Sequence, residues 1–357
     1  MKKWLVLGVI LCSALTLTSH FTKATVLRLD EIAGDWRQAA IEKQLAPFAK
    51  GSFTREQLRA YPRSHVTYLY EIDKGQLRVV PPEGEDSFGR YRNKVLEAAV
   101  NRILAVKPLP DMTFLLHVGD YSIMDREDKV PMLVFSKSEK KSFDIMIPDF
   151  EMFTVDRKLW KPVLKASRKY RWGRKQNVAF WRGSTSGGDF AGPYWKQFPR
   201  AQMMVLAQQA HDLINAQFTA HSQGADRNPE FLAQMGTVGQ RVSVADHLAY
   251  KYLIDIDGNA STYSRYFWIL LSNSVPIKVV SHFSQWYYEG LVPFEHYVPV
   301  AYDCGDLIEQ ISWAEQHEKQ AYQIAKASQA FALKYLSEEG VHTYLYHLLN
   351  RYSGIVK

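Results

Sequence analysis

The stretch KYLIDIDGNASTYSRYFWILLSNSVPIK, residues 251–278, has the pattern that decides the fold prediction. An apolar run ends in Asp-Gly, a loop of small hydroxyl residues follows, and a second apolar run begins after the loop. We predict a buried strand over 251–256, a helix over 263–272 and another strand over 275–280. A helix start has free N–H groups and a partial positive charge, which suits an anion. The alternative is an ordinary surface turn before a capped helix.

The same alternation of strand and helix patterns runs through the rest of the chain and predicts an α/β protein. Further helices are expected over 27–49, 87–106 and 200–216, and further strands within 65–80, 112–122 and 132–138. The tail predicts a helix over 306–340, capped by Gly340, and a last helix after it. A Lys- and Arg-rich segment at 155–176 indicates a domain boundary. We therefore expect a first α/β domain at 25–165 and a second domain with C-terminal helices at 166–357.

The composition excludes several classes of protein. The 357 residues are 46% apolar and 13% aromatic, which is enough for a folded core and excludes global disorder. The formal charge of +7 suits phosphate-bearing ligands or an anionic membrane, and nothing in it calls for a nucleic-acid partner. The two cysteines, Cys12 and Cys304, build neither a disulfide framework nor a zinc site. The eleven histidines are scattered, so a histidine-rich metal centre is not expected either.

The N-terminal segment 1–24 has two lysines and then an apolar run from Trp4 to Leu17. This length fits the core of a signal peptide and is short for an independent membrane span, although an uncleaved anchor is also consistent with it. A buried first strand or helix is the alternative. Membrane association through this segment is therefore an expectation.

Two polar turns that follow apolar strands are candidate sites. In HVGDYS (117–122), Asp120 directly follows a strand, and a partly desolvated carboxylate there suits a general base. A turn-capping aspartate is the alternative. In FWRGSTSGG (180–188), three glycines allow the backbone N–H groups to approach a phosphate, unless the segment is only a flexible loop. Arg200, which opens the next helix, has the length to reach the same anion.

The loop in the opening stretch holds a third candidate. Asp255 and Asp257 form an Asp-x-Asp pattern, which suits a divalent cation, although Asp257 also begins an Asp-Gly turn and the structural interpretation is favoured. Arg265 in the first turn of the helix is unfavourable there unless something negative, such as a pyrophosphate, binds beside it. The aromatic stretch 286–300, with Glu289 and Glu295, is a fourth candidate that would flank a ribose or a base; core packing is the alternative.

Taken together, FWRGS, KYLIDIDGNAS-x-x-x-R, NSVPIK and WYYEGLVPFEHYVPV occur in an order that resembles glycosyltransferase family 90, over roughly residues 105–350. The resemblance implies a GT-B fold, in which two Rossmann-like domains face a cleft. It also implies inverting transfer from a UDP-sugar without a cofactor or a catalytic metal. Asp120 matches the family's catalytic base. The implied donor-binding residues are Gly183, Ser184, Arg200, Gly258, Asn259, Ala260, Ser261, Thr262, Tyr263 and Arg265.

The sequence departs from the family pattern in ways that suggest its acceptor. One extra residue lies between Gly258 and Arg265, Asn259-Ala260-Ser261 forms a glycosylation sequon in the donor loop, and the cysteine pairs of animal members are absent. The sequon and the absent cysteine pairs favour a bacterial member that acts on a glycan or glycolipid of lipopolysaccharide or capsule. A protein O-glycosyltransferase, a metal-dependent transferase that uses Asp255 and Asp257, and an inactive carbohydrate-binding protein remain alternatives. The expected location is the cytoplasmic membrane face in a bacterium or the secretory lumen in a eukaryote.

Overall fold

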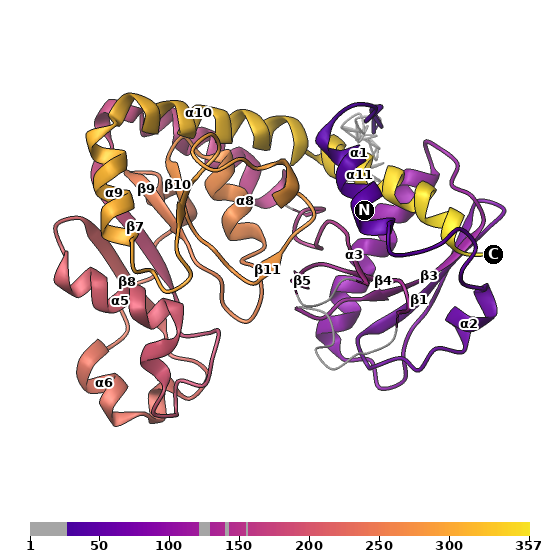
Figure 1. The fold of residues 1–357 in the computed structure, drawn as a ribbon, viewed down its shortest axis with the longest axis horizontal. Coiled ribbons are helices and arrows are strands. Elements are labelled where there is room, and N and C mark those ends of the chain that lie inside the picture. Colours follow the sequence, from indigo (N-terminus) through magenta and orange to yellow (C-terminus); the bar gives the residue numbers. More distant parts are fainter. Residues whose placement is uncertain (1–26, 121–128, 140–142, 155) are drawn as a thin grey trace, which may run out of the picture.

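The strands form two main sheets, one from each half of the sequence (Figure 1). This computed structural model describes residues 27–120, 129–139, 143–154 and 156–357, so the predicted N-terminal segment 1–24 lies outside the described residues. Within the described residues, each main sheet has five strands and is covered by helices. The predicted α/β fold with two sheet-containing halves is therefore confirmed.

The first sheet is mixed, with the strand order β2-β1-β3-β4-β6 among the described residues. β1 pairs antiparallel with both β2 and β3, and the pairs β3–β4 and β4–β6 are parallel. The predicted hairpin in 65–80 is correct, and Lys74 and Gly75 form its turn with positive φ angles. This half is thus Rossmann-like only in its parallel part. The bounds are β1 (Thr67–Asp73), β2 (Gln76–Val80), β3 (Met112–His117), β4 (Met132–Val134) and β6 (Asp144–Met146).

The second sheet is parallel throughout, in the order β12-β10-β9-β7-β8 among the described residues. Parallel strands place their carboxyl ends at one edge, where α/β proteins bind ligands. A short antiparallel pair, β5 (Lys137–Ser138) with β11 (Phe283–Ser284), links the two halves. The bounds of the second sheet are β7 (Gln176–Ser184), β8 (Ile214–Ala220), β9 (Tyr250–Asp255), β10 (Val275–Val279) and β12 (Val298–Val300).

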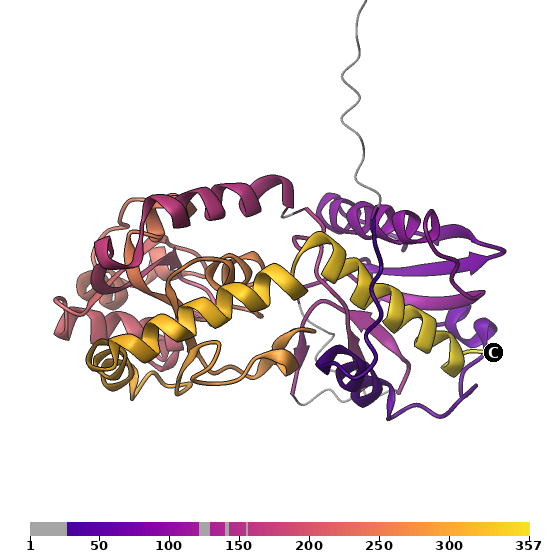
Figure 2. The ribbon, with the colours of Figure 1, turned by 90° about the horizontal axis from the view of Figure 1, so that it is seen from above.

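The last helix returns to the first half. Figure 2 shows α10 running along the second half and α11 continuing across the first. On α11, Tyr344 and Tyr352 are fully buried, and the Tyr352 ring meets Phe114 of β3 with centroids 6.2 Å apart. The first half is therefore completed by the C-terminus, and the boundary at 165/166 stays a prediction. In the described residues, no helix is both long and apolar enough to cross a bilayer.

The helix bounds complete the description of the fold. They are α1 (Trp36–Leu45), α2 (Arg55–Arg59), α3 (Ser87–Leu104), α4 (Lys161–Lys169), α5 (Pro199–Gln209), α6 (Pro229–Met235), α7 (Val244–His247), α8 (Ser264–Leu271), α9 (Leu307–Gln316), α10 (Glu318–Tyr335) and α11 (Glu338–Tyr352).

Three helix predictions are wrong in their bounds. The expected helix 200–216 ends at Gln209, because Ala210 leaves the helical conformation, and β8 begins at Ile214. The expected helix 27–49 is α1 alone, which starts after the Asp35 cap. The expected helix 306–340 is interrupted near His317 and again after Tyr335.

Gly340 is not the cap that the sequence predicts. It lies in the first turn of α11, where its N–H donates to the Ser337 hydroxyl at 3.1 Å. A Cβ at this position would lie 2.4 Å from the carbonyl oxygen of Tyr335. Glycine is therefore required by the tight turn between α10 and α11 and does not end a helix.

Candidate active site

A cavity of about 410 Å³ opens between the two halves and collects most of the predicted site residues. The sequence brings these residues from distant positions, because the strands of each sheet end close to the junction. The first half contributes Phe88, Tyr91, Arg92, Asp120, Phe150 and Glu151, and the second half contributes Ser186, Arg200, Gly258, Asn259, Ala260, Ser261, Thr262 and Tyr263.

Asp120 lies at the cavity on the segment after β3, and its side chain is 41% exposed. Its Oδ1 accepts a hydrogen bond from Nη2 of Arg92 at 2.7 Å, and its backbone oxygen accepts one from the hydroxyl of Tyr263. The sequence predicts a partly desolvated carboxylate at Asp120. In the structure this carboxylate is about half exposed, and Arg92 holds it in place. A positioned, solvent-accessible carboxylate is able to accept a proton from a bound hydroxyl.

Arg92 is a site residue that the sequence analysis missed. It lies on α3 and is nearly fully buried, with its guanidinium 3.8 Å from the Phe88 ring centroid and 4.4 Å from that of Phe150. A second hydrogen bond, to the carbonyl of Val118 at 2.8 Å, fixes its direction. On an amphipathic helix Arg92 is indistinguishable from a solvated charge, so no sequence signal marks it.

Arg200 joins the ends of two strands of the second sheet. Its guanidinium donates to the carbonyls of Ser184, Ile256 and Asp257 at 2.8, 3.1 and 3.0 Å, and to the Ser186 hydroxyl at 2.6 Å. Burial, helped by the nearby Arg265, lowers the pKa of Arg200 to about 10, so the side chain stays cationic at neutral pH. Arg200 thus lines the cavity and also builds its wall.

Arg265, Gly183 and Ser184 lie behind the cavity surface. Arg265 donates to the carbonyl of Arg182 at 2.6 Å, and burial lowers its pKa. The carbonyl of Ser184 is held by Arg200, and Gly183 packs over the Trp181 ring, where a Cβ would come within 2.4 Å. These predicted donor-binding residues do not line the cavity in this structure; they pack behind the residues that do.

The loop from Gly258 to Tyr263 is fixed by contacts to its own half. Asn259 Oδ1 accepts hydrogen bonds from the N–H of Gly187 at 3.1 Å and from the side chain of Gln223 at 2.6 Å. The carbonyl of Ala260 accepts from the N–H of Gly258 at 3.2 Å, and Thr262 donates to Asp255 Oδ1 at 2.5 Å. The loop is therefore held in one shape at the cavity.

The end of this loop and the first residue of α8 contact the first half at three points. The hydroxyls of Ser261 and Ser136 are 3.1 Å apart, and the Tyr263 hydroxyl reaches the backbone of Asp120. The N–H of Ser264, the first residue of α8, donates to Glu151 Oε2 at 2.9 Å. Tyr263 has a φ of +42° and caps α8 with no side-chain bond, so Glu151 supplies the negative group that the helix start favours.

The Asp-x-Asp pair binds a lysine. Nζ of Lys278, on the neighbouring strand β10, lies 2.6 Å from Asp255 Oδ2 and 2.8 Å from Asp257 Oδ1. The three side chains are only 6%, 0% and 8% exposed. Burial raises the pKa of Asp257, whereas the two carboxylates overcome burial and raise the pKa of Lys278. A divalent cation would have to displace this ammonium group, so the structural interpretation of the pair is favoured.

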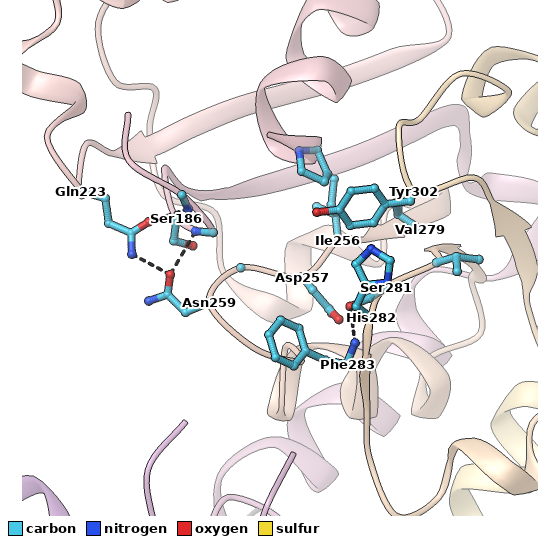
Figure 3. A pocket seen from close by; sticks show the side chains of 15 residues that line it. Ser186, Gln223, Ile256, Asp257, Asn259, Val279, Ser281, His282, Phe283 and Tyr302 are labelled. Carbon is cyan, nitrogen blue, oxygen red and sulfur yellow. Dashed lines mark hydrogen bonds between the residues drawn. The ribbon is translucent and has the colours of Figure 1, made fainter. Parts of the chain in front are cut away.

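A second cavity, of about 430 Å³, lies at the carboxyl edge of the parallel sheet (Figure 3). Its walls lie at or shortly after the ends of all five strands of that sheet within the described chain. They are Ser186, Gly187, Gly188, Gln223, Ile256, Asp257, Gly258, Asn259, Val279, Val280, Ser281, His282, Phe283 and Tyr302, with Pro199 from α5. Sequence analysis missed the part from Val279 to Phe283 and Tyr302. The position of these residues directly after apolar strands is the signal that could have found them.

The fourth predicted candidate, residues 286–300, does not line either cavity. Trp286 and Tyr287 are fully buried in the core, and Glu289 forms an ion pair with Lys43 at 2.7 Å. Core packing explains this aromatic stretch. Within the described residues, no group of three or more His, Cys, Asp or Glu side chains is arranged to hold a metal ion.

Comparisons with known proteins agree with the resemblance in the sequence. The profile of Glycosyl transferase family 90 matches residues 36–357. The chain is 24% identical over 333 residues to "Protein O-glucosyltransferase 1" of Rattus norvegicus, which covers 88% of this chain and 78% of that protein. It is 27% identical over 308 residues to "Protein O-glucosyltransferase 2" of Danio rerio, with 84% of this chain covered and only 58% of that protein.

A solved structure from Anabaena, in complex with UDP and glucose, is 12% identical, with a TM-score of 0.42 over 72% of this chain and 75% of that one. The relatives and the family match support a transferase. Since the family profile spans almost the whole described chain, the protein belongs to glycosyl transferase family 90.

Proposed function

We propose that the protein is an inverting glycosyltransferase that moves a hexose or pentose from a UDP-sugar to a hydroxyl group of a glycan acceptor. One observation carries the proposal: a single cavity is lined by the Asp120 carboxylate from one half and by the 258–263 loop of the parallel-sheet half. A transfer reaction needs this arrangement, in which a base for the acceptor faces a site for the donor.

In the proposed reaction, Asp120 accepts the proton of the acceptor hydroxyl while the oxygen attacks C1 of the sugar. The C1–oxygen bond to UDP breaks on the opposite face, so the anomeric configuration inverts. Arg92 serves as a positioning residue, since its 2.7 Å bond sets the direction of the carboxylate. A general base of this kind contributes about 10²–10⁴-fold to a rate.

The donor is proposed to span the two cavities. They share Ser186, Gly258 and Asn259, so a nucleotide in the cavity of Figure 3 would lead its sugar past these residues to Asp120. The diphosphate would then lie over Arg200, whose positive charge favours the leaving UDP. No step in this scheme uses a metal ion.

The preferred acceptor is a glycan or glycolipid hydroxyl of lipopolysaccharide or capsule. A protein hydroxyl is the second candidate, because the named relatives are protein O-glucosyltransferases. Their names also make UDP-glucose the first donor to try. An inactive carbohydrate-binding protein on the same scaffold would bind glycan but no UDP.

The test combines binding and turnover. Calorimetry with UDP in the presence of EDTA should detect binding to the wild type, and hydrolysis should be screened with UDP-glucose, UDP-xylose and UDP-galactose. Asp120→Asn should bind UDP normally but turn over at least about 100-fold more slowly with the preferred donor. Asp73→Asn, at the exposed end of β1, serves as the matched control and should keep the full rate.

Two results would contradict the proposal in different ways. Absence of UDP binding removes the donor assignment, and a full transfer rate in Asp120→Asn removes the base assignment. Loss of activity after chelation would instead favour the metal-dependent alternative at Asp255 and Asp257.

A further inference from the structure

A dense group of cations runs from the residues just before α4 along this helix to the turn after it. This group, which we name the α4 patch, consists of exposed lysines and arginines with no acidic residue between its first and last members. They are Lys158, Lys161, Lys165, Arg168, Lys169, Arg171 and Arg174. The chain has 44 Lys and Arg against 37 Asp and Glu, so the remaining residues have 37 of each sign. The summed charge of the α4 patch therefore equals the whole net charge of the protein, +7.

The helix keeps this charge on its solvent side. α4 buries Val163, Ala166 and Ser167 against the protein and leaves its lysines and Arg168 exposed. None of the seven cations forms an ion pair with a carboxylate of the described residues. Like charges at helical spacings of three and four residues destabilise a helix, so an opposing negative surface would relieve the repulsion.

An aromatic groove lies beside the patch. A cavity of about 480 Å³ between the end of α4 and α10 is lined by Arg168, Arg171 and Lys326 together with Trp172 and Tyr322. The two aromatic rings are 5.2 Å apart, and Tyr322 is 39% exposed. Trp and Tyr are enriched at membrane–water interfaces, and flanking cations attract lipid phosphates, so the groove favours a bilayer over a free nucleic acid.

The start of the described chain and α4 lie at the same edge of the molecule, which agrees with membrane contact at that edge (Figure 2). Figure 2 shows α4 along one edge of the molecule, and the indigo segment before α1 begins at the same edge. The 26 residues that precede the described chain include the apolar run from Trp4 to Leu17. A segment that enters a membrane from that edge would bring the α4 patch to the lipid surface.

We propose that the α4 patch docks the protein on an anionic membrane, with the phosphates of lipid headgroups as its ligands. The apolar N-terminal segment and the patch then act as two signals for one surface. A single weak membrane signal gives reversible binding, and a polybasic surface strengthens it. This inference is independent of the transfer reaction.

The experiment measures partition of the full-length chain onto vesicles of phosphatidylcholine alone and onto vesicles that also contain phosphatidylglycerol. Each cation near an anionic surface contributes roughly a fivefold change, so Lys165→Gln with Arg168→Gln should weaken binding to anionic vesicles about 30-fold. Lys50→Gln with Lys74→Gln removes the same charge from exposed positions of the first half and should change it less than about threefold. Added salt should weaken wild-type binding to the anionic vesicles.

Retention of the preference for anionic vesicles in the patch variant would overturn the proposal, as would an equal loss in both variants. An equal affinity of the wild type for both vesicle types would also overturn it, because the apolar segment alone would then account for binding. The proposal would also be overturned if the wild type bound a single-stranded RNA more tightly than anionic vesicles and this RNA binding depended on the α4 patch. Circular dichroism of both variants checks that the fold is retained.

Discussion

Substitution of Lys278 by methionine should destabilise the protein strongly. In the wild type, one ammonium group serves two carboxylates, Asp255 and Asp257, at 2.6 and 2.8 Å in a site almost closed to water. The variant leaves both carboxylates buried without their cation. Breaking a buried ion pair in this way costs about 3–5 kcal/mol. For a domain of this size, that free energy corresponds to a fall in Tm of about 6–20 °C.

A matched control tests whether burial causes the loss. Lys251 lies on β9 of the same sheet and is as buried as Lys278, but its partner Glu318 is 57% exposed. In Lys251→Met the glutamate turns to water, so the cost should be about 1 kcal/mol or less. Adding Asp255→Asn and Asp257→Asn to Lys278→Met should recover part of the lost stability, because neither carboxylate is then left buried without the lysine. Urea unfolding followed by circular dichroism measures all three. A loss below about 1 kcal/mol in Lys278→Met would refute the reasoning.

Two further predictions concern carboxylates at the junction. Glu151→Gln removes the negative group from the N-terminus of α8, so calorimetry should show UDP binding about fivefold tighter. The exposed control Glu83→Gln, in the first half, should leave UDP binding unchanged. Weaker UDP binding in Glu151→Gln would contradict the idea that the donor competes with this side chain. Burial, with the adjacent Glu151 charge, raises the pKa of Asp149 to about 7, above its unfolded value. Its stabilising contribution is therefore present below about pH 4 and is lost as the pH rises through 7. Relative to Asp149→Asn, the wild type should lose about 1.4 kcal/mol per pH unit between pH 5 and 7 in urea unfolding, and parallel curves for the two proteins would disprove this assignment.

Local patterns predicted the elements whose ends are marked by the chain itself. The hairpin of β1 and β2 has Lys74-Gly75 at its turn, and β9, α8 and β10 are separated by Asp-Gly and polar residues. β8 was missed because Ile214 continues the apolar spacing of α5 and no Gly or Pro marks Ala210 as the helix end. That helix ends where tertiary pairing with β7 begins, which a local pattern does not contain.

The part of the site that local sequence patterns mark could be predicted from the sequence. Asp120 and the 258–263 loop follow apolar strands, and the position after a strand is a local feature. Arg92 and Glu151 gain their roles from contacts with residues far away in sequence, at Asp120 and Ser264. A side chain whose function depends only on such contacts has no local signature.

The same distant contacts give the donor loop a second role. Within four residues, Ser261, Tyr263 and Ser264 each contact the first half, and the contact of Tyr263 is to the backbone of Asp120 itself. A ligand that displaces Glu151 from α8 would remove one of these three contacts and leave the other two to hold the halves together. Under the proposed function, the position of the base therefore depends on the loop that binds the donor. The segment between Gly258 and Arg265 lies in this junction, where one geometry has to serve both halves at once.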